Sequence, residues 1–66
     1  MAIKYGSHAR EQMVARGISE LEVEKAIKRG SKELQGKTKI LAHYQYFTVV
    51  YKRIADDLFV ITVKPR

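Results

Sequence analysis

The chain has 66 residues and no cysteine, and its thirteen Lys and Arg against seven Asp and Glu give a net charge of +6 that favours anionic partners. This length fits one domain over residues 1–66 with a thin core, because folding buries only about 60% of the surface that so short an unfolded chain exposes. The lack of cysteine excludes a disulfide framework and a thiolate metal site. No apolar run approaches the ~20 residues that span a bilayer. We therefore expect a cytoplasmic domain without a cofactor.

The first half of the chain predicts a short strand and then a helix. Residues 2–5 could form the strand, and Ser7 then offers its side-chain oxygen to the free amides of a first helical turn. The helix should follow over about residues 8–16, with Met13 as its buried anchor. Gly17 supplies the left-handed residue that commonly ends a helix.

A capping box marks the start of a second helix. Ser19 and Glu22 have the spacing at which each side chain accepts a hydrogen bond from the other residue's amide. Acidic residues crowd the first half of this helix and basic residues the second, as the helix dipole favours, and Gly30 ends it. Its apolar face is narrow and consists of Val23, Ala26 and Ile27. Because isolated helices under about 12 residues are marginal in water, this helix must dock on a sheet.

From Lys39 onward the apolar residues alternate, which predicts antiparallel strands with one buried face. The residues expected on that buried face are Phe47, Val49, Tyr51, Phe59, Ile61 and Val63. Pairing them across a hairpin requires an odd number of loop residues. We therefore expect a three-residue loop over 55–57, with Asp57 in the left-handed position.

Two more strands complete the expected sheet. A strand over about residues 38–43 should turn at Tyr44 and Gln45, and residues 32–34 could add an edge strand. We therefore predict an α+β fold, in which two short N-terminal helices pack on a three- to four-stranded antiparallel sheet, with residues 2–5 as an optional short strand before the first helix.

The open face of this sheet is expected to carry the functional side chains. Its residues would be Thr48, Val50, Lys52, Val60, Thr62 and Lys64, with His43 and Tyr46 near one end. Lysines along strands can neutralise successive phosphates, and Tyr44 and Tyr46 could stack on bases, each stack contributing about 1–3 kcal/mol. The alternative interpretation is structural, because lysine on exposed strands prevents edge aggregation and tyrosine is common in sheets.

Histidine is the side chain best suited to proton transfer near neutral pH, which makes His8 and His43 the candidate catalytic residues. Either could instead be structural, His8 in the first turn of a helix and His43 as a cross-strand neighbour. Arg16, in the last helical turn, could cap carbonyls or contact an anion. Arg10 and Arg53 are candidate phosphate clamps because of their planar guanidinium groups. No cluster of His and acidic residues has convincing metal-ligand spacing.

The segment Ser7–Ser19 contains the pattern His-Ala, then Met, then Arg-Gly-Ile. Together with the charged second helix and the closing Val-Val-Tyr and Val-Ile-Thr-Val strands, it resembles the small bacterial and archaeal family known as domain of unknown function 4258, over nearly the whole chain. The resemblance implies a helix pair followed by an antiparallel sheet. It implies no particular function.

Some domains of that family are similar to the RelE and ParE superfamily of toxins, which includes ribosome-dependent messenger RNA nucleases. The residues of this chain that match the signature in Ser7–Ser19 are His8, Ala9, Arg10, Met13, Arg16, Gly17 and Ile18. The sequence departs from the pattern at Gln12, where the family often has arginine. A nuclease site that uses a cation at that position would be weakened here.

Three functions of different class follow from these observations. The first is contact with RNA or the ribosome, with a metal-independent endoribonuclease as its catalytic form, in which His8 or His43 would move protons. The residues expected to contact nucleic acid are Arg10, Arg16, Tyr46, Lys52, Arg53 and Lys64. The second is non-enzymatic binding of an acidic protein partner, for example an antitoxin-like tail. The third is a structural protein that dimerises over a sheet edge.

Overall fold

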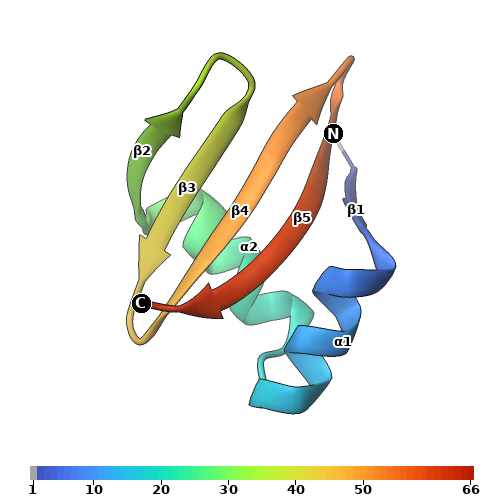
Figure 1. Ribbon diagram of the computed structural model, residues 1–66, viewed down its shortest axis with the longest axis vertical. Helices are drawn as coiled ribbons and strands as arrows, with labels where there is room; N and C mark the ends of the chain where they lie inside the picture. Colours follow the sequence, from blue (N-terminus) through green and yellow to red (C-terminus); the bar gives the residue numbers. More distant parts are fainter. Residues whose placement is uncertain (1) are drawn as a thin grey trace.

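Two helices cover one face of a five-stranded sheet in the computed structural model, which describes residues 2–66 (Figure 1). The elements in chain order are β1 (Ile3–Tyr5), α1 (Ser7–Arg16), α2 (Glu20–Arg29), β2 (Ser31–Gln35), β3 (Lys39–Tyr44), β4 (Phe47–Ile54) and β5 (Asp57–Pro65). The strands lie in the order β1-β5-β4-β3-β2, with β1 parallel to β5 and the other neighbouring pairs antiparallel. Neither of the helices described is long and apolar enough to cross a membrane.

The predicted α+β class and the pair of N-terminal helices are confirmed, but the predicted count of three to four antiparallel strands is too low. Both optional strands form, because residues 2–5 contain β1 and residues 32–34 lie within β2. β1 is parallel to β5, and the two helices and the strands β2, β3 and β4 lie between them in the chain. The sheet is therefore mixed.

Local sequence signals place most of the helix ends. Ser19 and Glu22 form the predicted capping box, in which the Glu22 amide donates to Ser19 Oγ at 3.2 Å and the Ser19 amide donates to Glu22 Oε1 at 3.0 Å. Gly17 ends α1 with a φ of 69°, as predicted. The N-cap of α1 is Gly6 rather than Ser7, and its amide donates to a β5 carbonyl at 3.0 Å. The start of α1 is thus fixed by its attachment to the sheet.

The core lies between the helices and the sheet. α1 packs on β5, and α2 packs on β3 and β4. Met13 of α1 and Val23 and Ala26 of α2 are buried, which confirms the apolar faces predicted for both helices. The core cluster comprises Ala9, Met13, Ile18, Val23, Ala26, Ala42, Phe47, Val49, Tyr51, Leu58, Val60 and Val63.

A bulge in the pairing of β4 with β5 decides which β5 side chains reach the core. Tyr51 pairs with Val60, whereas the residue before Tyr51 pairs with Thr62. Ile61 is therefore left without a partner on β4, and the alternation of faces inverts there. The prediction that placed Phe59 and Ile61 in the core is wrong, because both are only half-buried. Val60, predicted on the open face, is instead fully buried in the core.

The two hairpin loops each differ from prediction by one residue. The β4–β5 loop consists of Ala55 and Asp56, and Ala55 takes the left-handed conformation, with a φ of 55°, in place of Asp57. The turn before β4 lies at Gln45 and Tyr46, with Gln45 at a φ of 50°. Both loops are two residues long, which keeps the strands paired up to their ends.

Asp57 attaches the start of β1 to the sheet. Its carboxylate accepts a hydrogen bond from the Ala2 amide at 3.3 Å and pairs with the Lys4 ammonium at 3.3 Å. The hydrogen bond from Ala2, followed by the contact with Lys4, holds the pKa of the Asp57 carboxyl below its usual value. Both contacts lie at the surface, so we expect them to orient β1 more than to stabilise the fold.

Gln12 of α1 forms hydrogen bonds with the part of the β5 edge that lies beyond the end of β1. Its side-chain oxygen accepts hydrogen bonds from the Val63 amide, at 2.9 Å, and from the Thr62 hydroxyl. A strand amide that β1 does not reach is thereby satisfied. Gln12 therefore has a structural role in this chain.

Replacing Gln12 by alanine is expected to lower the free energy of unfolding by about 1 kcal/mol, because the Val63 amide loses its side-chain acceptor. Glu11→Ala, at the exposed neighbouring position, is the matched control and should change stability by less than about 0.5 kcal/mol. Urea unfolding followed by circular dichroism measures both variants. Equal losses in the two would show that the contact with β5 contributes nothing.

Candidate nucleic-acid interface

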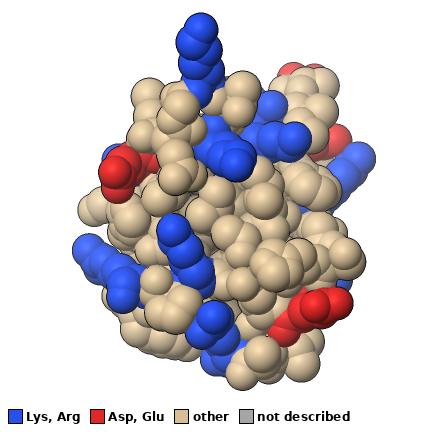
Figure 2. All heavy atoms as spheres, viewed as in Figure 1, with Lys and Arg blue, Asp and Glu red and all other residues tan. Residues whose placement is uncertain are grey.

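The face of the sheet that turns away from the helices is called here the open sheet face. Strand register assigns to it Lys4, Ser31, Glu33, Gln35, Lys39, Leu41, His43, Thr48, Val50, Lys52, Ile54, Asp57, Phe59, Thr62 and Lys64. Figure 2 looks onto this face, with the helices behind it as in Figure 1. Basic side chains are spread over the face, and acidic atoms lie toward its periphery. The open sheet face is therefore the positive surface that the sequence predicts.

One row of cations crosses the sheet near the β4–β5 loop. Lys39 lies directly opposite Lys52 on the neighbouring strand, and the Lys52 ammonium lies 6.0 Å from the centre of the Phe59 ring. Like charges directly opposite each other on adjacent strands destabilise a sheet, by up to about 1 kcal/mol. The ion pairs formed within residues 2–66 involve neither lysine. A bound anion would relieve their repulsion.

A second row lies toward the other end of the same strands. Lys64 is opposite Thr48, which is in turn opposite His43. Along β4 the step from Thr48 to Lys52 places the two rows about 13 Å apart, at about 3.3 Å for each residue. The two rows thus present cations at separate points along one face.

Leu41 and Val50 lie between the two rows, flanked by Glu33 on β2 and by Thr62 on β5. Leu41 and Val50 are 7% and 5% exposed, although they lie outside the core cluster beneath the helices. Since no helix covers this face, neighbouring side chains of the sheet must bury them. The open sheet face therefore combines an apolar centre with cations around it.

His43 is held on this face by two hydrogen bonds. Its Nδ1 lies 2.9 Å from the Thr48 hydroxyl oxygen, and its Nε2 lies 2.9 Å from a Glu33 carboxylate oxygen. Thr48 is buried, so this side of the ring is fixed. The side chain of Glu33 is 66% exposed, and a surface pair of this kind contributes little to stability. A ligand could therefore displace Glu33 and reach Nε2.

The open sheet face collects some of the predicted site residues. These are His43, Lys52 and Lys64, with Tyr46 in the exposed turn before β4. Arg53 lies on the opposite side of the sheet, because it pairs directly with the core residue Leu58. Neighbouring residues of a strand alternate in direction, so Arg53 and Lys52 cannot contact the same ligand face.

The candidates on α1 lie in the other layer of the molecule. His8, Arg10 and Arg16 belong to this helix, which packs on β5 and lies beside the lower end of that strand in Figure 1. His8 and His43 are therefore not brought together as an acid–base pair. Arg10 is engaged locally, because its guanidinium lies 3.1 Å from the Glu20 carboxylate and 5.0 Å from the centre of the Tyr5 ring.

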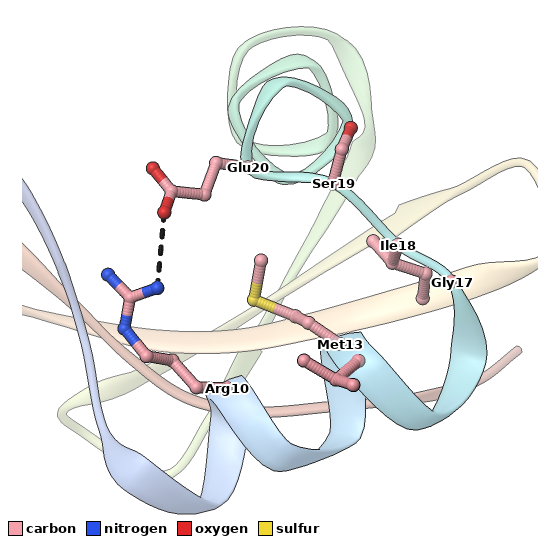
Figure 3. Close-up of a pocket in the computed structure, with 7 residues that line it drawn as sticks. Arg10, Met13, Gly17, Ile18, Ser19 and Glu20 are labelled. Atoms are coloured by element: carbon pink, nitrogen blue, oxygen red, sulfur yellow. Dashed lines mark hydrogen bonds and ion pairs between the residues drawn. The ribbon is translucent and has the colours of Figure 1, made fainter.

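The ion pair of Arg10 with Glu20 spans one side of a pocket of about 390 Å³ between α1 and α2 (Figure 3). Met13 and Ile18 line its interior, and Val14, 84% exposed, lies at its rim. This lining is mostly apolar, and its hydroxyl, that of Ser19, is engaged in the capping box with Glu22. The pocket could accept an apolar side chain, but it offers no chemistry.

Sequence reasoning did not single out Lys39 and Glu33 as site residues. Placing the turn at Gln45 and Tyr46 would have set Lys39 opposite Lys52, because the register follows from the turn. The approach of Glu33 to His43 depends on the pairing of β2 with β3 across the turn that contains Gly36. Within residues 2–66, no group of three or more His, Asp or Glu side chains is placed to hold a metal ion.

Comparison with known families places the chain. The sequence model of a family described as a domain of unknown function, DUF4258, matches residues 5–64. The chain belongs to this family. Its match includes the signature on α1 and the closing strands, which confirms the resemblance seen in the sequence. Among curated proteins, none matches this DUF4258 domain.

The fold of this DUF4258 domain is similar to that of a solved chain in the toxin–antitoxin complex RelBE2 from Mycobacterium tuberculosis. The two superpose with a TM-score of 0.68 over 98% of this chain and 96% of that chain, at 10% sequence identity. At this identity the likeness shows a shared fold alone. That fold agrees with the resemblance to the toxin superfamily noted from the sequence.

Proposed function

We propose that this domain binds RNA through the open sheet face. The observation that carries the proposal is the direct juxtaposition of Lys39 and Lys52, which lie outside the ion pairs formed within residues 2–66. Lys64 adds a cation from the second row. Lysines fixed on a sheet can contact phosphates at separate points, and the net charge of +6 attracts a polyanion at longer range.

The apolar and aromatic side chains of the same face favour RNA over a simple polyanion. Phe59 is half-buried beside Lys52, whereas Leu41 and Val50 are almost fully buried within the face. Tyr46 is 56% exposed in the turn before β4, but its ring is held edge-to-face against the core residue Phe47 at 5.3 Å between ring centres, so Phe59 is the ring that the open sheet face itself offers. An exposed base that stacks on such a ring gains about 1–3 kcal/mol. Phosphate contacts and base contacts are thus available together.

An endoribonuclease is the second candidate, and the position of His43 favours it. In metal-independent cleavage a base takes the proton of the ribose 2′-hydroxyl, the 2′-oxygen attacks the phosphate, cations stabilise the charge that develops there, and an acid protonates the departing 5′-oxygen. His43 can offer Nε2 to a ribose or phosphate oxygen once Glu33 is displaced. Lys64, in the same row, would stabilise the phosphate. His8 would take no part, because it lies on α1.

Replacing Lys39, Lys52 and Lys64 together by glutamine is expected to lower the affinity for single-stranded RNA. Because each phosphate contact on a single strand adds about 0.7 to the slope of log affinity against log salt, the slope should fall by about 2. Fluorescence anisotropy with labelled RNA across a salt series measures both quantities. Electrophoresis of the same samples shows whether the RNA is also cut.

The matched control is the triple variant Arg16→Gln, Lys25→Gln and Arg53→Gln. It removes the same charge from exposed positions outside the open sheet face. We expect it to keep the salt slope of the original protein. If both triple variants lose affinity and slope equally, binding follows net charge alone and the open sheet face is not the RNA site. Intact RNA after binding would limit the function to recognition.

A further inference from the structure

The two edges of the sheet differ in whether their outer backbone groups have hydrogen-bond partners within the described residues. At one edge, β1 pairs with the first half of β5, and Gln12 of α1 accepts from the Val63 amide farther along the same strand. At the other edge, β2 pairs with β3 on its inner side only. Figure 1 shows β2 as the outermost strand on that side, with no element beyond it. Its outer backbone groups are therefore available to another strand.

The side chains of β2 leave this edge accessible. Each of the five residues of β2 is exposed, including Leu34, which is 75% exposed. Leu34 pairs with Ile40 on the helix side of the sheet, but α2 packs on β3 and β4. An exposed strand edge thus lies beside an apolar side chain that nothing in the described fold covers.

The positive charge of the chain is concentrated around this edge. Residues 28–39 contain five basic residues and one acidic residue, so this segment carries a net +4 of the total +6. The basic residues are Lys28, Arg29, Lys32, Lys37 and Lys39, and the acidic one is Glu33. Glu33 is engaged with His43 at 2.9 Å. The field beside β2 therefore attracts an acidic ligand.

The backbone and the charge together select the kind of ligand. A strand edge presents N–H donors and C=O acceptors, and another polypeptide strand satisfies both, whereas phosphates can only accept. A second copy of this chain would bring the same +4 segment against itself, which like-charge repulsion disfavours. An acidic polypeptide strand has both donors and acceptors for the β2 backbone, and its negative charge is attracted to the basic segment.

We propose that β2 is the docking edge for an extended acidic segment of another protein, which adds a strand to the sheet beside β2. Backbone hydrogen bonds along the five residues of β2, about 17 Å, supply the affinity. Alternate side chains of the added strand contact Leu34, and its carboxylates lie near the basic residues of α2 and the β2–β3 turn. The β4 and β5 part of the open sheet face stays free, so this edge is separate from Lys52 and Lys64 of the RNA surface.

The test uses the full-length isotope-labelled protein and a short synthetic peptide in which Glu and Val alternate. Hydrogen exchange followed by NMR should show alternate β2 amides protected by about tenfold or more when the peptide is bound. A peptide of alternating Glu and Pro has the same charge but cannot form a regular strand ladder, and it should protect none of them. Equal protection by both peptides, or no binding of the Glu–Val peptide, overturns the proposal.

Two protein variants separate this edge from the RNA surface. Replacing Lys28, Arg29 and Lys37 by glutamine should weaken the Glu–Val peptide about tenfold, while replacing Lys52 and Lys64 should change it by less than about twofold. The second variant should lose RNA affinity, so each proposal can fail without the other. If the peptide shifts the β4 and β5 residues of the open sheet face, or if β2 becomes protected with rising protein concentration alone, the acidic segment is not the occupant of this edge.

Discussion

Replacing Phe47 by alanine is expected to leave much of the protein unfolded in water. Phe47 is the largest fully buried side chain, and its ring makes edge-to-face contacts with Tyr44 and Tyr46. Deleting a buried phenylalanine ring costs about 3–5 kcal/mol. At about 0.05–0.15 kcal/mol for each residue, a chain of this length has only about 3–10 kcal/mol of stability in total. The midpoint of urea unfolding measures the loss.

Phe59→Ala is the matched control for this experiment, because it changes the same residue type on the adjacent strand. Phe59 is half-buried on the open sheet face beside Lys52, outside the core cluster. Its removal should cost about 1 kcal/mol. Similar losses at Phe47 and Phe59 would contradict the bulge at Ile61, because without that bulge both rings would face the helices.

The contrast between these two phenylalanines shows which parts of the fold can be predicted from the sequence. Capping at Ser19, the left-handed end at Gly17 and the amphipathic face of α2 depend on residues within one or two turns, so local rules predict them correctly. The strand alternation through β4 is equally local. The α+β class follows from these elements together.

The bulge opposite Tyr51 cannot be predicted in the same way. Unbroken alternation over Phe59, Ile61 and Val63 suits a regular strand, and the neighbouring Val60 is also apolar, so the sequence favours neither face. Packing places Val60 in the core, because Val60 then lies on the same helix-covered face as Leu58. The partners of these two residues on β1 are Tyr5 and Ile3, which pack against the same core. A strand whose two faces are both apolar in sequence has a weakly specified register.

The residues of the candidate site also fall into those that local strand alternation places correctly and those that depend on tertiary pairing. Lys52 and Lys64 are predicted on the open sheet face because their parity relative to Phe47 and Val63 is correct on either side of the bulge. Arg53, one position beyond Lys52, points to the opposite face, so it stays a candidate phosphate contact outside the open sheet face. The contact of Glu33 with His43 joins residues from two strands across the β2–β3 hairpin, so it depends on tertiary pairing.

Gly30→Ala is expected to destabilise the protein by about 3 kcal/mol, although alanine can adopt the backbone conformation there without strain. Gly30 has a φ of −70° and a ψ of 162°, so its role is not conformational. A Cβ at this position would lie 2.6 Å from the Ala26 carbonyl oxygen and 2.7 Å from the His43 carbonyl oxygen. Both are backbone atoms, so either α2 or β3 must move. Urea unfolding measures the cost, and the NMR signals of the His43 ring should shift because its strand is displaced.

Gly36→Asn in the β2–β3 turn is the control for Gly30→Ala. Gly30 lacks room for a Cβ but has an ordinary φ, whereas Gly36 has room for a Cβ but a left-handed φ. Gly36 has a φ of 69°, and nothing lies within 4 Å of a Cβ built there. Asparagine tolerates the left-handed region, so this change should cost less than about 1 kcal/mol. If Gly30→Ala costs no more than Gly36→Asn, α2 does not approach β3 as closely as the structure places it. If it costs clearly more, the absence of a side chain at Gly30 is what allows α2 to end against β3, directly before the chain forms the open edge at β2.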